Sequence, residues 1–378
     1  MRAFFLIIHS KLRSACLLGA ILATQATAGF SSIYAFGDGV CTTTADLEPA
    51  NLFYGPAGQK RYCNGRIWIE VMSGWQGVTY DGAKNVSDYG HLSSELVADL
   101  NALGNPADAA TSLFIIWCCD ADFVDMATNS LPPYTSQVPW NDMINQSIID
   151  HTNAVNSLYA KGVRTIVMPN AVNIASIPLF NSFDPDDRNF IRDRVIQFNA
   201  QFETAMSNLM AINSGLKIIR PNVFAFFEQV LLSPTVYGLV NPTPTELEPD
   251  INAATVVLPG ASAIAGSPGS NYVFWDYWHP TARFQMHLAA FIQQIITPVK
   301  VSSISLSGAN VNLQVANIPL GRAGSILGSA NLQPPWAVDQ AINESFVEGG
   351  STTKTYTFAA SGLKRFYRAA FPVVWVWP

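Results

Sequence analysis

One carboxylate and one imidazole stand at a spacing that suits acid–base chemistry. In residues 275–280, Trp-Asp-Tyr-Trp-His-Pro, Asp276 precedes His279 by three positions, between an apolar run and a helical pattern. This spacing lets the carboxylate orient the imidazole, fix its tautomer and stabilise the imidazolium that forms when the ring takes a proton. An Asp and a His also occur at this spacing by chance, so the rest of the chain must supply the site around them.

The elements that would position this pair alternate along the chain. Continuous apolar runs predict strands that are buried on both faces of a sheet, and they cover residues 32–36, 112–117, 163–168, 216–219 and 272–275. Helical patterns fall between these runs. Strands that alternate with helices predict an α/β domain with a parallel sheet, helices on both faces, and functional loops at the carboxyl ends of the strands.

The clearest helical pattern follows Asp184, which is a plausible N-cap with Pro185 at the first helical position. Apolar residues then recur at steps of four and three, as one helical stripe requires: Ile191, Val195, Phe198, Phe202, Ala205 and Leu209. A second stripe includes His151, which we interpret as a core histidine rather than a ligand.

Several blocks in order resemble the SGNH/GDSL hydrolase family. Residues 33–39, Ile-Tyr-Ala-Phe-Gly-Asp-Gly, are similar to the family's apolar strand followed by Gly-Asp-Ser. Residues 61–70, Arg-Tyr-Cys-Asn-Gly-Arg-Ile-Trp-Ile-Glu, resemble its R-F-S-N-G-x-x-W-x-E stretch, and residues 117–123 occupy the slot of W-x-G-x-N-D-x. Gly90 falls at the second-block glycine. The resemblance covers roughly residues 32–298 and implies an SGNH-type three-layer α/β/α fold.

The resemblance also implies a site, and the sequence departs from it. In the family a serine attacks an ester carbonyl, a histidine is the base, and the serine N–H, a glycine N–H and an asparagine amide bind the oxyanion. The catalytic pair His279 and Asp276 matches, as does the oxyanion-hole glycine Gly90. Gly39 keeps the backbone N–H but has no hydroxyl.

The third block departs as well. Ala121 has no side-chain amide, and Cys119 replaces a glycine. Losing one oxyanion donor costs about 100- to 1,000-fold in turnover, and losing the nucleophile costs ~10⁴-fold or more. Gly39, Cys119 and Ala121 are therefore the degenerate positions of the predicted site.

Two functions remain open at this stage. By resemblance the chain is an ester hydrolase of the lipase/esterase class, acting on a small-molecule ester or an acylated glycan. With Gly39 in place of serine, His279 would activate a water in the space left free, or Cys41 or Thr42 just beyond the turn would be recruited. The alternative is a non-catalytic ligand- or glycan-binding protein on a hydrolase scaffold. Trp278 and Cys41 are candidates to line the ligand cleft.

The cysteines after residue 28 allow a disulfide or a metal site. Cys41, Cys63, Cys118 and Cys119 all lie in blocks that converge on the cleft in the family fold. We expect one disulfide, Cys41 with Cys63. A zinc site with His279 is the weaker alternative because no Cys-x-x-Cys pair is present, so we expect neither metal nor cofactor.

The N-terminus and the composition restrict the cellular setting. Residues 1–28 predict a signal peptide, with basic residues, a short apolar run and Ala-Thr-Ala at 26–28. Its removal would change the formal net charge from −6 to −9, because it contains three basic and no acidic residues. We expect a secreted or periplasmic protein that is not integral to a membrane. The chain has no basic run, so nucleic acid is an improbable partner.

The remaining length, 350 of 378 residues, predicts two domains. Residues 29–298 form the hydrolase-like domain, within which residues 241–271, rich in Pro, Ala, Gly and Ser, are either a lid or a surface excursion. Residues 299–378 predict a small all-β module, because apolar residues alternate with small polar ones in short runs.

Overall fold

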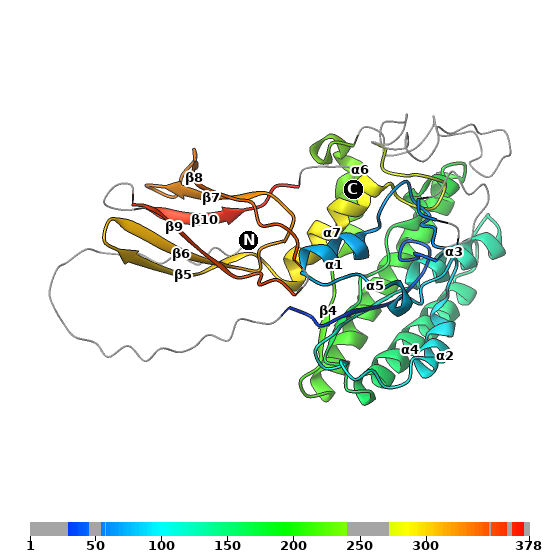
Figure 1. The fold of residues 1–378 in the computed structure, drawn as a ribbon. Coiled ribbons are helices and arrows are strands. Elements are labelled where there is room, and N and C mark those ends of the chain that lie inside the picture. The colour runs from blue at the N-terminus through cyan, green and yellow to red at the C-terminus, as the bar shows by residue number, and fades with distance from the viewer. Residues whose placement is uncertain are drawn as a thin grey trace. The chain divides into compact units, whose positions relative to one another are not determined.

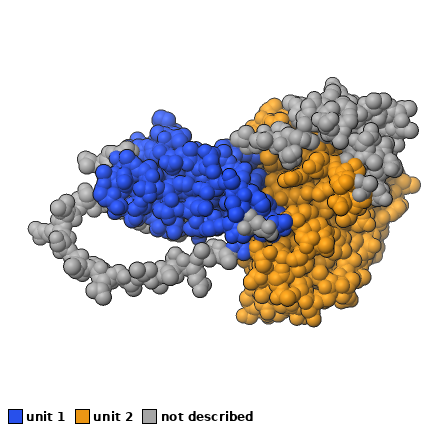
Figure 2. All heavy atoms as spheres, viewed as in Figure 1, with its two compact units in different colours: residues 1–29, 73–79, 297–374 blue, residues 30–72, 80–296, 375–378 orange. Residues whose placement is uncertain are grey.

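A computed structural model describes residues 29–44, 54–56, 58–239, 272–347, 349–360 and 365–373. The chain divides into two compact units, coloured separately in Figure 2. Unit 2 comprises residues 30–72 and 80–296 together with 375–378, and unit 1 comprises residues 1–29, 73–79 and 297–374. The C-terminal unit therefore begins at Thr297 and includes Ser73–Thr79, a segment that the sequence places in the first domain.

Unit 2 is built on a parallel four-stranded sheet with the order β1-β2-β3-β4. The strands are β1 (Ile33–Gly37), β2 (Leu113–Trp117), β3 (Thr165–Val167) and β4 (Lys217–Ile219). Every residue of β1 and β2 is buried, as their continuous apolar sequences predict. Gly37 pairs with Trp117, so the turns that follow these two strands begin at the same edge of the sheet.

A short extended segment runs alongside the edge of β1 that does not pair with β2. Asn85 forms an isolated parallel bridge with Ala35. The N–H groups of Val86 and Asp88 then donate to the carbonyls of Ala35 and Gly37, at 2.9 Å and 3.1 Å. This segment brings Gly90 to the carboxyl end of β1, beside the turn that contains Gly39.

Helices flank the sheet in two groups (Figure 1). Helices α2, α4 and α5 pack on one another, whereas α1, α6 and α7 are linked through ring contacts and a Trp68–Gln285 hydrogen bond. The bounds are α1 (Trp68–Trp75), α2 (Leu96–Ala102), α3 (Cys119–Ser130), α4 (Val138–Ala160), α5 (Pro185–Ile212), α6 (Val223–Leu232) and α7 (Ala282–Ile296). Short 3₁₀ turns lie at Gly82–Lys84, Ser93–Glu95, Ile174–Ser176, Pro178–Phe180 and Pro234–Tyr237.

The long helix α5 begins where the sequence predicts, with Asp184 as N-cap and Pro185 in its first turn, although the Asp184 side chain makes no capping hydrogen bond. Its buried stripe contains Met206, whereas the predicted Ala205 is only half-buried. The fifth predicted strand, residues 272–275, is wrong. This segment folds back on itself, and Phe274 bridges Pro280 within one tight loop.

Unit 1 contains the predicted all-β module. Two antiparallel sheets, β10-β7-β8 and β5-β6-β9, share one apolar cluster that includes Leu313, Ile326 and Ile342. The strands are β5 (Lys300–Ser307), β6 (Asn310–Ala316), β7 (Gly324–Ser329), β8 (Ala337–Ile342), β9 (Lys354–Ala359) and β10 (Phe366–Ala370).

Two sequence predictions fall outside the described residues: the signal peptide at residues 1–28 and the candidate lid at 241–271. Among the helices that the structure does describe, none has the length and apolar character needed to cross a bilayer.

Candidate active site

The loop before α7 holds Asp276 and His279 in a fixed geometry. Its ends are joined by a hydrogen bond from the Trp275 N–H to the His279 carbonyl at 2.8 Å. Asp276 Oδ1 accepts the N–H groups of Trp278 and His279 at 2.8 Å and 2.6 Å. Thr281 ends the loop and caps α7, because its hydroxyl accepts the Phe284 N–H at 3.3 Å. The carboxylate is therefore fixed by the backbone of the loop that it orients.

The imidazole of His279 makes its own contacts with the same carboxylate. Nδ1 lies 2.8 Å from Asp276 Oδ2 and 3.1 Å from Oδ1. This network assigns the ring proton to Nδ1 and leaves Nε2 as the proton acceptor. The Tyr62 ring stacks on the imidazole with centroids 4.7 Å apart, and His279 is only 5% exposed.

Residues 61–70 contact both the imidazole of His279 and the start of α7. Arg61 binds Glu70 through two hydrogen bonds of 3.1 Å and 2.6 Å. Asn64 Oδ1 accepts the Ala282 N–H at 2.8 Å, at the start of α7. The block thus positions the first turn of α7, three residues after His279, and provides Tyr62 for the stack.

Gly39 lies directly against the imidazole. A Cβ atom built on Gly39 would stand 2.3 Å from His279 Nε2 and 3.1 Å from Cδ2. The imidazole therefore occupies the space next to residue 39 in which we expected a water. A water activated by His279 must lie on the pocket side of Nε2 instead.

Two backbone N–H groups beside the imidazole have no partner. Within the described residues, neither the Gly39 N–H nor the Gly90 N–H donates a hydrogen bond. Gly90 has φ +66°, a conformation that other residues adopt only with strain. Both glycines line the same pocket as His279. Unpaired N–H groups in such a pocket are suited to bind an oxyanion.

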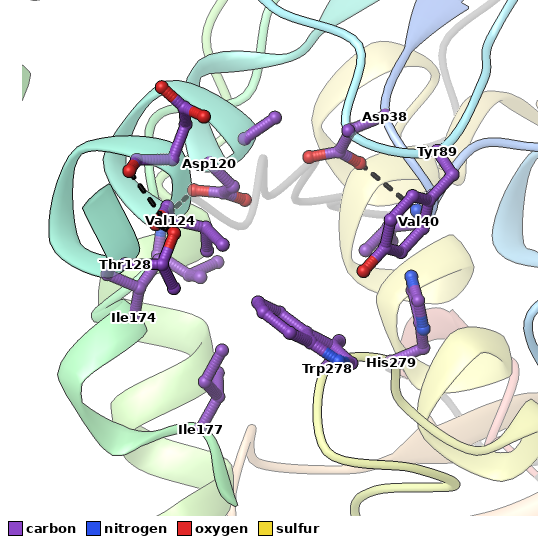
Figure 3. A pocket seen from close by; sticks show the side chains of 15 residues that line it. Asp38, Val40, Tyr89, Asp120, Val124, Thr128, Ile174, Ile177, Trp278 and His279 are labelled. Carbon is purple, nitrogen blue, oxygen red and sulfur yellow. Dashed lines mark hydrogen bonds between the residues drawn. The ribbon is translucent and has the colours of Figure 1, made fainter. Parts of the chain in front are cut away.

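The pocket has a volume of about 240 Å³. In Figure 3, His279 and Tyr89 lie on one side of it, while Asp120 and the aliphatic side chains of Val124, Ile174 and Ile177 lie on the other. Its full lining comprises Asp38, Gly39, Val40, Tyr89, Gly90, Asp120, Ala121, Val124, Asp125, Thr128, Val172, Ile174, Ile177, Trp278 and His279.

Two buried carboxyls line this pocket. Burial raises the pKa of Asp38 to about 6, although its Oδ1 accepts the Val40 N–H at 3.0 Å. Burial and the neighbouring Asp38 raise the pKa of Asp120 well above its usual range. Asp122, by contrast, does not line the pocket. Its carboxylate accepts hydrogen bonds from two buried protein groups, the Ser93 N–H at 2.9 Å and the Ser147 hydroxyl at 2.5 Å.

The other predicted site residues divide between the pocket and the core. Trp278 and Ala121 line the pocket with Gly39, Gly90 and His279. Cys119 and Cys41 do not: both are completely or almost completely buried outside its lining. Cys41 is the last residue of the turn after β1, and burial raises the pKa of its thiol well above the usual value, which disfavours the thiolate.

The predicted Cys41–Cys63 disulfide is wrong, since all four described cysteines are free and buried. Cys63 Sγ lies 3.7 Å from Asn64 Oδ1, and Cys118 Sγ lies 3.8 Å from Nε2 of the buried His151. The described residues include no group of three or more His, Cys, Asp or Glu side chains placed to hold a metal.

Sequence reasoning missed most of the wall opposite His279. Asp120 stands at a variable position of the family's third block, so the sequence gives it no predicted role. Val172, Ile174 and Ile177 follow β3 as an apolar, Pro- and Asn-flanked loop. A loop with aliphatic residues at the carboxyl end of a predicted strand was the available signal for them.

A parallel sheet flanked by helices, with a His–Asp pair at the carboxyl ends of its strands, is the fold that the resemblance to SGNH/GDSL hydrolases implies. The sequence comparison agrees with this class. A stretch of 178 residues is 24% identical to a GDSL esterase/lipase of Arabidopsis thaliana, which confirms the predicted resemblance. This match includes 45% of the chain and 43% of the relative, so the chain spans less than half the length of the curated relative it matches. No family model matches the chain.

Solved structures that are similar to the chain include two named hydrolases. The acetylxylan esterase Axe2 of Geobacillus stearothermophilus aligns with 71% of this chain and 96% of its own, at 13% identity and a TM-score of 0.41. A putative GDSL-like lipase of Parabacteroides merdae aligns with 70% of this chain and 94% of its own, at 11% identity and a TM-score of 0.38.

Proposed function

We propose that this protein is an exported carboxylic-ester hydrolase that works without a serine nucleophile. The observation that supports this most directly is the position of His279 Nε2, which is oriented by Asp276 and lies at a pocket beside the unpaired N–H groups of Gly39 and Gly90. The leader-like sequence at residues 1–28 supports export.

In this mechanism Nε2 takes a proton from a water on the pocket side of the ring, and the water oxygen attacks the ester carbonyl. The carbonyl oxygen becomes an oxyanion that accepts hydrogen bonds from the two glycine N–H groups. Collapse of the intermediate releases the acid, and the leaving alcohol takes the proton back from His279. Asp276 is the positioning residue, because it holds the ring tautomer and stabilises the imidazolium.

The pocket favours an ester with an apolar acyl group. Its wall opposite His279 presents Val124, Val172, Ile174 and Ile177, and the described residues contribute no Lys or Arg side chain to its lining. A short aliphatic chain placed on this wall would bury apolar surface. The proposed substrate is therefore a small-molecule ester. Acylated glycans, which contain the same ester bond, are the second proposed class of substrate.

The alternative is a non-catalytic protein that binds such a ligand. Gly39 provides no hydroxyl and Ala121 no amide, and these two absences favour this alternative. Hydrolysis assays with p-nitrophenyl acetate, p-nitrophenyl butyrate and an acetylated glycan separate the two functions. Slow turnover that His279→Ala abolishes and His287→Ala preserves would support hydrolysis, because His287 lies on α7 outside the pocket. Binding of the esters without turnover would support the alternative.

A further inference from the structure

Asp120 is a buried acid in the pocket that the mechanism above leaves without a role. It is 7% exposed, lies in the first turn of α3 and directly precedes Ala121. Ala121 occupies the position at which the resembled family places its oxyanion-binding asparagine. Asp120 thus reaches the pocket from the same helical turn, across from His279 (Figure 3).

The hydrogen bonds of Asp120 leave one oxygen for the pocket. Oδ1 accepts the Val172 N–H at 2.8 Å, whereas Oδ2 has no hydrogen bond within the described residues. The Trp117 indole N–H also lies near the carboxyl and, like the Val172 N–H, acts to lower its pKa, although it makes no hydrogen bond of normal geometry. Because Asp120 lines the pocket and keeps a small exposed fraction, this oxygen is accessible from the pocket and can contact a ligand there.

The surroundings of Asp120 favour its neutral form. The titratable groups around it are Asp38 after β1, Asp122 and Asp125 on α3, Tyr89 and His279 across the pocket, and the buried thiols of Cys41, Cys118 and Cys119. Among the described residues, no Lys or Arg lines the pocket. Burial and the Asp38 carboxyl hold the pKa of Asp120 well above its usual range. A neutral carboxyl has one O–H donor, and such acids can bind an oxyanion in an apolar site.

We propose that Asp120 is a further catalytic residue of this site, whose neutral carboxyl donates from Oδ2 to the ester oxyanion in place of the missing asparagine amide. This role rests on the proposed hydrolysis. No proton is transferred: the O–H bond stays intact, and the hydrogen bond strengthens as charge develops on the carbonyl oxygen. Together with the N–H groups of Gly39 and Gly90, Asp120 completes a set of three donors.

Two substitutions at position 120 separate donation from packing. In Asp120→Asn the Val172 N–H still requires an acceptor, so the amide oxygen stays at the Oδ1 position and Nδ2 replaces the O–H donor. This variant should keep most of the activity. Asp120→Ala should reduce kcat by about 100- to 1,000-fold with little change in KM, because the bond forms mainly in the transition state. Adding Ala121→Asn to Asp120→Ala should restore part of the loss.

The pH dependence gives a second readout. Activity of the wild type should fall as pH rises through the pKa of Asp120, since the ionised carboxylate cannot donate, whereas Asp120→Asn should not show this fall. The ¹³C NMR signal of the Asp120 carboxyl, assigned with Asp120→Asn, should be that of a neutral acid at the pH at which the wild type is most active.

An Asp120→Ala variant as active as the wild type would overturn this role and leave the hydrolase intact. So would an Asp120→Asn variant as slow as Asp120→Ala, or a carboxyl signal that is ionised at the pH of maximal activity. A wild type without any ester turnover would instead overturn the proposed function, and this role with it.

Discussion

Adding one methyl group at residue 39 should displace the imidazole of His279. The added Cβ would stand 2.3 Å from Nε2, and ordinary contact begins near 3.4 Å, so the ring must retreat by about 1 Å. The retreat is opposed on two sides, because Asp276 Oδ2 lies 2.8 Å from Nδ1 and the Tyr62 ring is stacked 4.7 Å from the imidazole.

The cost of Gly39→Ala follows from this crowding. Overpacking of a buried site typically destabilises a protein by ~1–3 kcal/mol. A 1 Å misplacement of a reacting group can reduce the rate by about 100-fold. We expect both effects, measured as the free energy of unfolding in urea and as kcat on a p-nitrophenyl ester. Gly74→Ala on α1 is the matched control, since its added Cβ meets no atom within 4 Å, and it should be neutral or stabilise by up to about 1 kcal/mol.

Gly39→Ser adds the same Cβ together with the hydroxyl that the family uses. We therefore expect it to be destabilised like Gly39→Ala and to gain no serine-type turnover. If Gly39→Ala matched the wild type in stability and Gly39→Ser gained activity strongly, the imidazole would be free to withdraw. The account of residue 39 given above would then be refuted.

Three further predictions concern the Asp276–His279 pair, the buried carboxyl of Asp38 and the four buried thiols. Asp276→Asn should lower kcat by up to ~10⁴-fold, because the amide no longer fixes the acceptor tautomer; unchanged kinetics would contradict the dyad. The pKa of Asp38 near 6 means that the folded chain holds this proton more tightly than the unfolded chain, so stability is lost as pH rises from about 4 to 6. We expect the free energy of unfolding in urea, relative to that of Asp38→Asn, to fall by roughly 2 kcal/mol between pH 4 and pH 7. A difference between the two proteins that stays constant with pH would contradict this prediction. In the native state no described thiol should react with a thiol reagent, whereas unfolding should expose all four: Cys41, Cys63, Cys118 and Cys119.

The sheet was predictable because its strands are short apolar runs bounded by polar turns. Strands β1 to β4 each fall within or overlap such a run. The segment 272–275 has the same composition but forms no sheet strand. Its chain reverses at once, because Asp276 binds the N–H groups of Trp278 and His279 and closes a loop. An apolar run does not distinguish a strand from a buried loop that is held by one side chain.

Contacts between distant blocks could not be read from the sequence. The approach of His279 to Gly39 depends on how the loop before α7 meets the turn after β1, some 240 positions earlier in the chain. The disulfide expectation failed for a related reason: blocks that converge on one site can still direct their thiols to separate parts of the core. Position 120 is variable in the family pattern, so only the pocket drew attention to its carboxyl.

The most direct test of a serine-independent hydrolase is the initial rate of p-nitrophenyl butyrate hydrolysis at neutral pH by the wild type, His279→Ala and His287→Ala. We expect turnover in the wild type and in His287→Ala, and a rate equal to the buffer background in His279→Ala. A wild-type rate equal to the background, or a rate that His279→Ala leaves unchanged, would contradict it.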